Sequence, residues 1–153
     1  MTGEVAIREA LEEDLPGVLA LYAQPGLDDG HTLTVEQAKL HYRRFKQYPN
    51  YRLFVAELNG AIVGTFALLI MDNLAHLGTP SGVVEDVVVT ADLRGKGIGR
   101  RMMEAALVIC RESGCYKMAL SSNLKREAAH AFYESLDFEK HGYSFRVVFQ
   151  KNH

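Results

Sequence analysis

Two acidic residues and a cluster of glycines lie close together in the stretch VVEDVVVTADLRGKGIGRR, residues 83–101. Glu85 and Asp86 are adjacent in a run of valines typical of a strand. Apolar neighbours raise the pKa of a carboxyl group, which suits a general base. Three glycines follow, just before an amphipathic pattern typical of a helix. Because free N–H groups at a helix start bind phosphate or pyrophosphate, the stretch predicts proton transfer beside a phosphate-binding turn.

The two carboxylates are expected to point to opposite faces of their strand, because successive strand residues alternate. We expect only one of them to face a reacting amine directly. Glu85 is the preferred base, acting through a water molecule, and Asp86 is the alternative. For each, a structural carboxylate paired with a backbone or arginine group remains an open alternative. The alternation predicts that one face of the strand carries Glu85, Val83, Val87 and Val89, and that the other carries Asp86, Val84 and Val88.

The glycine spacing excludes or disfavours two familiar phosphate loops. A P-loop requires Lys and then Ser or Thr after its last glycine, whereas Gly99 is followed by two arginines. A dinucleotide fingerprint requires G-x-G-x-x-G directly after a strand and an acidic residue about 20 positions later. Here the glycines read G-x-G-x-G, and Gly114 and Cys115 stand at the acidic position. A glycine turn without a ligand is a further alternative, which the flanking basic residues disfavour.

A third pattern, [QR]-x-x-G-x-[GA], is matched by Arg94, Gly97 and Gly99. With the later segments KMALSSN and AHAFYESLDF, this motif resembles the GNAT superfamily of N-acetyltransferases. The resemblance follows nearly the whole chain in element order and is strongest over residues 83–138. Asp137 departs from the pattern, because the family usually has a glycine there.

The resemblance implies transfer of the acetyl group of acetyl-coenzyme A (acetyl-CoA) to a primary amine, by direct attack through a tetrahedral intermediate. Tyr133 matches the family's general acid; by helix spacing alone it would be a core aromatic. Asn123 is implied in binding the coenzyme or a water, or it caps the following helix. The residues implied in binding acetyl-CoA are Val87, Val88, Val89, Arg94, Gly95, Lys96, Gly97, Ile98, Gly99, Arg100, Asn123 and Phe132.

The acceptor is suggested by two similarities. Residues 81–99 together with 114–121 are similar to glucosamine-6-phosphate N-acetyltransferases. Residues 121–133 together with 141–149 are similar to aminoalkylphosphonate N-acetyltransferases. Both acceptors are small amines with an anionic group, so His76, Lys125 and Arg126 are expected to bind that group. Each of the three could equally be a solvated surface residue. Two alternatives stay open: a protein acetyltransferase acting on lysines or N-termini, and a non-catalytic sensor of acetyl-CoA.

The elements that must position these residues follow from periodicity and turn chemistry. Asp14 and Pro16 open a helix, and a capping box starts a second helix that continues to Phe45. Asn59 and Gly60 predict a two-residue hairpin turn. We then expect a strand over 83–90, a helix over 97–113, a strand over 115–122, a helix over 126–136 and a strand over 142–150. With a first strand at 5–8, the predicted order of elements is β-α-α-β-β-β-α-β-α-β, and one more strand could follow. This order predicts an α+β, GNAT-like fold, in which helices flank a mixed central sheet.

Length and composition set the remaining expectations. The 153 residues predict one domain, residues 1–153, and a net charge of −2 argues against nucleic-acid binding. Two cysteines in a C-x4-C pattern match no common zinc spacing, so no metal is expected. No apolar run reaches signal-peptide or membrane-spanning length, which favours the cytoplasm. The family resemblance suggests a homodimer formed through the terminal strand.

Overall fold

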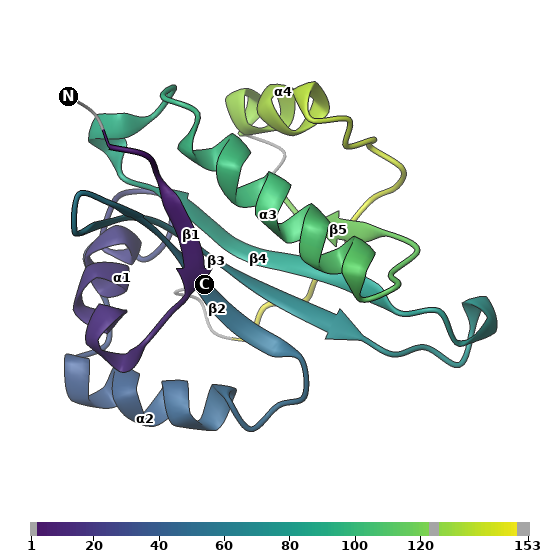
Figure 1. Cartoon of the computed structure of the whole chain (residues 1–153), viewed down its shortest axis with the longest axis horizontal. Coiled ribbons are helices and arrows are strands. Elements are labelled where there is room, and N and C mark those ends of the chain that lie inside the picture. The colour runs from purple at the N-terminus through teal and green to yellow at the C-terminus, as the bar shows by residue number, and fades with distance from the viewer. Residues whose placement is uncertain (1–2, 123–125, 150–153) are drawn as a thin grey trace. The chain divides into compact units, whose positions relative to one another are not determined.

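The computed structural model describes residues 3–122 and 126–149 (Figure 1). The chain divides into two compact units, Met1–Leu120 and Ser121–His153, and each is described by itself. The first unit holds the sheet, the carboxylate pair and the glycine turn. The second unit holds one helix, α4 (Glu127–Ser135), followed by irregular chain.

The sheet of the first unit has five strands in the order β1-β2-β3-β4-β5. The first four pair antiparallel, and β4 and β5 pair parallel. This mixed sheet confirms the α+β prediction. The strands are β1 (Ala6–Glu9), β2 (Tyr51–Leu58), β3 (Ala61–Met71), β4 (Ser81–Val89) and β5 (Met118–Leu120). The helices of this unit are α1 (Leu15–Tyr22), α2 (Val35–Phe45) and α3 (Ile98–Glu112), with short 3-10 turns η1 (Glu12–Asp14), η2 (His76–Gly78) and η3 (Ala91–Leu93).

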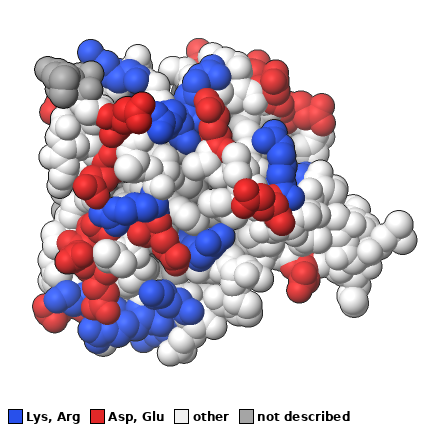
Figure 2. All heavy atoms as spheres, in the orientation of Figure 1, with Lys and Arg blue, Asp and Glu red and all other residues white. Residues whose placement is uncertain are grey.

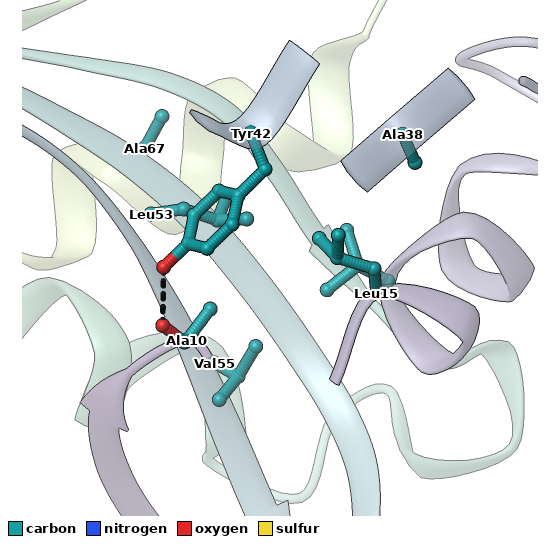
Figure 3. Close-up of a cluster of buried hydrophobic side chains, with 8 residues drawn as sticks. Ala10, Leu15, Ala38, Tyr42, Leu53, Val55 and Ala67 are labelled. Carbon is teal, nitrogen blue, oxygen red and sulfur yellow. Dashed lines mark hydrogen bonds between the residues drawn. The ribbon is translucent and has the colours of Figure 1, made fainter. Parts of the chain in front are cut away.

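Helices α1 and α2 pack on one face of the sheet. Leu53 and Val55 of β2 are buried in one cluster with residues of both helices (Figure 3). The hydroxyl of Tyr42, on α2, donates a hydrogen bond to the carbonyl of Ala10, which fixes the helix to the end of β1. Buried aliphatic and aromatic groups of this kind each contribute about 1.5–3 kcal/mol through the area they remove from water.

Helix α3 packs on the opposite face, where two strand glycines allow close approach. A Cβ on Gly64 would lie 2.8 Å from the sulfur of Met102, and one on Gly82 would lie 2.4 Å from the sulfur of Cys110. Both sulfur-bearing residues are on α3 and are buried. The two glycines therefore set how near α3, and the turn that precedes it, can lie to β3 and β4.

Local sequence signals in the first unit are confirmed. The Thr34 hydroxyl accepts a hydrogen bond from the N–H of Gln37 at 3.2 Å, and the Gln37 side chain accepts one from the N–H of Thr34 at 2.9 Å. Asn59 and Gly60 have φ angles of 51° and 80°, as a type I′ turn requires. These signals succeed because each one involves only neighbouring residues.

The predicted strand over 142–150 is wrong for its described part, since residues 142–149 form no strand. Tyr143, Phe145 and Phe149 are 84%, 91% and 95% exposed. An alternating apolar pattern shows which residues could share a face, but a strand also needs a partner for its N–H and C=O groups. Likewise, β5 is shorter than the predicted strand over 115–122, because its pairing with β4 covers only Met118–Leu120.

The close approach of α3 gives a stability prediction. Gly82→Ala places a methyl group against the Cys110 sulfur and should lower the free energy of unfolding by about 1–3 kcal/mol, measured by urea denaturation. Gly142→Ala is the control, since a Cβ there meets nothing within 4 Å. The double variant Gly82→Ala/Cys110→Ala should be more stable than the sum of the two single effects predicts. Full additivity would contradict a contact between these two positions.

Candidate active site

The carboxylate pair lies at an interruption of strand β4. Asp86 and Val87 together lie opposite the single residue Phe66 of β3, which defines a β-bulge. Asp86 has a φ of 53°, in the left-handed region that few non-glycine residues occupy. Such strain persists only where the surrounding structure imposes it, and it is frequent at active sites.

The bulge overturns the predicted grouping of the strand residues. Glu85 pairs with Ala67 of β3 and Val88 pairs with Thr65, and these two partners are two residues apart. Since paired residues share a face, Glu85 and Val88 lie on the same face, rather than Glu85 with Val87 and Val89. The prediction failed because strict alternation assumes a regular ladder.

Beside the bulge, β4 loses its outer neighbour. The parallel pairing joins Gly82, Val83 and Val84 to β5 and goes no further. Over residues 85–89 the outer edge of β4 therefore has no strand partner in the described part of the chain. Free N–H and C=O groups on such an edge can pair with an extended ligand that carries amide groups.

The protein around the bulge raises the pKa of both carboxyl groups. Burial is the larger cause for Glu85, and the charge of Asp86 adds to it. Burial is also the larger cause for Asp86, with the charge of Asp28 second. Burial and then the charge of Asp86 raise the pKa of Tyr22 and Tyr51 as well. The predicted direction of the carboxyl pKa shifts is thus found, and a raised pKa makes either group a stronger proton acceptor, as a general base requires.

The sequence predictions did not include Tyr22, Asp28 or Tyr51 as neighbours of the carboxylate pair. Tyr22 ends α1, Asp28 lies in the turn-rich segment after it, and Tyr51 begins β2. No motif links these positions to β4, and they are brought to it only by the packing of α1 and β2. Turn composition at residues 24–32 indicated a loop and nothing about what the loop contacts.

Downstream of β4, the chain turns through η3 and two glycines into α3. Gly95 and Gly97 have φ angles of 78° and 86°. A Cβ at either position would meet nothing within 4 Å, so glycine is needed there for the backbone conformation and the space above it is open. Gly97 is the N-cap of α3 and provides no side-chain cap.

The first hydrogen bond of α3 runs from the N–H of Arg101 to the carbonyl of Gly97, at 3.1 Å. The N–H groups of Ile98, Gly99 and Arg100 therefore have no carbonyl within the helix to bind. Ile98 as a whole is only 3% exposed, whereas Gly99 is half-buried and Arg100 is exposed, so the last two of these residues are the more accessible to a ligand. Exposed cationic side chains flank these N–H groups: Arg94, Lys96 and Arg100. An open N-terminus of this kind can hold a pyrophosphate group.

The other predicted site residues lie elsewhere or outside the described residues. His76 is in η2, between β3 and β4, and its ring lies 4.5 Å from that of Tyr116, which precedes β5. This places it beyond the start of β4, at the end away from the glycine turn. Asn123 and Lys125 lie outside the described residues.

Three of the predicted residues that the structure describes belong to the second unit. Arg126 precedes α4, and Phe132 and Tyr133 are on it, with ring centroids 5.3 Å apart. The ring of Phe138 meets the Tyr133 ring edge-on at 5.7 Å. Burial raises the pKa of Tyr133, and Arg126 offsets part of that rise. Tyr133 is therefore protonated at neutral pH, the state that a general acid needs.

Charge and metal-ligand patterns limit what else the described residues can bind. In Figure 2, the basic side chains over α2 are interleaved with acidic ones, and Arg43 pairs with Glu12 at 3.0 Å. Residues 3–122 and 126–149 contain no group of three or more His, Cys, Asp or Glu that could hold a metal ion. Within the same residues, no helix has both the length and the apolar character needed to cross a membrane.

A model of the acetyltransferase (GNAT) family matches residues 8–138. The chain belongs to this family. Glucosamine 6-phosphate N-acetyltransferase of Trypanosoma brucei brucei is 32% identical to it over 145 residues, which cover 94% of this chain and 95% of the relative. Aminoalkylphosphonate N-acetyltransferase of Salmonella typhimurium (strain LT2) is 29% identical over 135 residues, which cover 83% and 80%.

Among solved structures, a putative acetyltransferase from Agrobacterium tumefaciens str. C58 superposes with a TM-score of 0.86. It is 34% identical, and the match covers 94% of this chain and 99% of that one. The expected GNAT fold is confirmed, and this GNAT chain is an N-acetyltransferase. The open helix start and the free edge of β4 fit the coenzyme, because they offer N–H groups to its phosphates and an unpaired edge to its amide-bearing arm.

The coupling among the carboxylates can be measured directly. Asp86→Asn should lower the pKa of Glu85, because it removes a nearby negative charge, and Asp28→Asn should lower the pKa of Asp86 for the same reason. Carboxyl-carbon NMR titration reports both values. Glu112→Gln, at the exposed end of α3, is the control and should change neither. Unchanged titration of Glu85 in Asp86→Asn would contradict the described geometry of the bulge.

Proposed function

We propose that the chain transfers the acetyl group of acetyl-CoA to a small primary amine that carries an anionic group. The observation that carries this proposal is that one continuous segment, from the bulge in β4 to the start of α3, contains all the groups that follow. Within residues 85–100 it provides two carboxylates of raised pKa, an unpaired strand edge and free helical N–H groups. These match the needs of acyl transfer: a base, a place for the coenzyme arm and a place for its pyrophosphate.

In the proposed mechanism, acetyl-CoA supplies the acetyl group as a thioester. Glu85, directly or through water, removes the proton from the amine, and Asp86 is the alternative base. The nitrogen then bonds to the acetyl carbon, which gives a tetrahedral intermediate with a negative oxygen, and the carbon–sulfur bond breaks when this intermediate collapses. A backbone N–H near Val87 stabilises the negative oxygen, and Tyr133 gives its proton to the departing thiolate. A single well-placed donor to such an oxygen contributes about 10²–10³ in rate.

The anionic acceptor is supported by the names of the relatives in Trypanosoma brucei brucei and Salmonella typhimurium. A second support is a shallow surface cleft of about 360 Å³ in the first unit, which includes Lys46, Arg52 and Tyr51. The charges of Asp86 and Glu85 act on Tyr51, and the lining of the cleft also includes the acidic Glu9. The carboxylates attract the ammonium group of the substrate, and the two cations attract its acidic group.

The proposal is tested with matched pairs of amines: glucosamine 6-phosphate with glucosamine, and 2-aminoethylphosphonate with ethanolamine. The rate is measured as the release of free coenzyme A. In at least one pair, kcat/KM should be at least tenfold higher for the anionic amine than for its partner that lacks the acidic group. In Lys46→Ala/Arg52→Ala this preference should shrink, mainly through KM. The kcat/KM should fall as the pH drops through the raised carboxyl pKa, because a protonated carboxyl cannot accept the amine's proton.

Three results would decide against parts of this proposal. Equal rates for both members of each pair would overturn the anionic acceptor. Acetylation of peptides but of no small amine would favour the protein acetyltransferase. Binding of acetyl-CoA without turnover of any amine, with Tyr133→Phe no different from the natural chain, would favour the sensor.

We also propose that two copies of the chain associate through residues 143–149. Tyr143, Phe145, Val147 and Phe149 alternate along this segment and are at least 79% exposed. Contiguous exposed apolar surface of this kind is uncommon on monomers. The period of two is that of a strand, and a second copy can provide the pairing that the segment lacks within its own chain.

Light scattering after size exclusion tests this association. The natural chain should elute as a dimer, and Tyr143→Ser/Phe145→Ser should shift it towards the monomer. Leu40→Ser, an exposed leucine of α2, is the control and should leave the dimer intact. A monomer at tens of micromolar protein would overturn the proposal.

A further inference from the structure

Gln24, just after α1, joins two segments that are far apart in the sequence. Its side-chain amide accepts a hydrogen bond from the N–H of Ala91 at 2.8 Å and donates one to the carbonyl of Val89 at 3.3 Å. The same NH₂ group lies 3.3 Å from the carbonyl of Leu21, in the last turn of α1. Gln24 is half-buried, so these bonds are partly shielded from water.

The two backbone groups that Gln24 holds flank the residue at which β4 ends. Val89 is the last residue of β4, and Ala91 is the first of η3, which leads to the glycine turn. Between them, the N–H of Thr90 donates to the carbonyl of Val63 on β3 at 2.8 Å. The exit from the strand is therefore fixed from two sides, by the backbone of β3 and by the amide of Gln24.

This exit sets the spacing between two parts of the proposed coenzyme site. The free edge of β4 lies before it, and the free N–H groups of α3 lie after it. A ligand that contacts both must match their separation, and small displacements of such groups weaken binding. By fixing the strand exit, these hydrogen bonds hold the start of α3 at a set distance from the edge of β4, which the ligand must match.

Gln24 also belongs to the segment that lies beside the carboxylates. Tyr22 and Asp28 flank it, the N–H of Asp28 donates to the carbonyl of Tyr22 at 3.1 Å, and the charge of Asp28 acts on Asp86. The segment 22–28 is therefore hydrogen-bonded to the start of the glycine turn, and its Asp28 acts on the bulge through its charge. Gln24 is the residue of this segment that is bonded to the turn.

We propose that Gln24 is a positioning residue for acetyl-CoA, which it serves by fixing the step from β4 into the glycine turn. This inference rests on the proposed function, in that it takes the turn and the strand edge as the coenzyme site. The role needs a donor and an acceptor on one side chain, which glutamine has. Glutamate could accept from Ala91 but would set an oxygen against the Val89 carbonyl, and methionine has the size but neither strong group.

The test compares the natural chain with Gln24→Met, Gln24→Glu and the control Gln47→Met, which alters an exposed glutamine after α2. Calorimetric titration with acetyl-CoA gives the dissociation constant, and steady-state kinetics gives KM for each substrate. Gln24→Met should weaken acetyl-CoA binding about tenfold, since it removes both hydrogen bonds to the strand exit. The KM for the amine should change less than twofold, and Gln24→Glu should weaken coenzyme binding at least as much.

A second readout is hydrogen exchange at the Ala91 amide, which should become faster in Gln24→Met and stay unchanged in Gln47→Met. If the natural chain does not bind acetyl-CoA, the proposed function itself fails. If it binds and Gln24→Met binds equally well, only the role of Gln24 is overturned. The role would also be overturned if Gln24→Met had a lower Tm and bound acetyl-CoA and the amine equally less well. The same holds if Gln24→Met did not fold while Gln24→Glu bound acetyl-CoA normally. Either result would mean that Gln24 only stabilises the fold.

Discussion

The bulge at Asp86 is the constraint on which the candidate site depends. One extra residue in β4, in the left-handed conformation, interrupts the ladder with β3 shortly after the pairing with β5 stops. The adjacent edge of β4 is left without a strand partner among the described residues, and two carboxylates stand beside it. Strain at Asp86 costs about 1–3 kcal/mol, and the packing of the sheet between α1, α2 and α3 must offset it.

The same strand then leads into a site made largely of backbone. Gly95 and Gly97 give the turn its shape, and Gly97 brings no capping side chain to the first N–H groups of α3. Recognition by N–H groups and a helix dipole fits phosphate without any dedicated side chain. Close packing of α3, permitted by Gly64 and Gly82, holds this helix start near β4. The proposed base and the proposed phosphate site are therefore connected through β4 and α3.

Sequence patterns predicted most elements of the first unit, and the family motif placed the glycine turn. Thr34 with Gln37, and Asn59 with Gly60, were predictable because a cap or turn depends on adjacent residues alone. The grouping of Glu85 with Val87 and Val89 was wrong, because a bulge depends on how β3 is paired. The strand expected at 142–150 was wrong over its described residues, because a strand also needs a partner, which an alternating pattern does not provide.

The sequence by itself determined the family, the order of the elements up to α4, and the presence of a carboxylate pair before a glycine-rich helix start. These depend on local spacing, which is read along the chain. Only the tertiary structure decided which residues surround that pair. Tyr22, Asp28 and Tyr51 come to the bulge, and Gln24 to the strand exit, through the packing of α1 and β2 on the sheet. Contacts across tens of residues carry no local pattern, because they depend on where the folded elements meet.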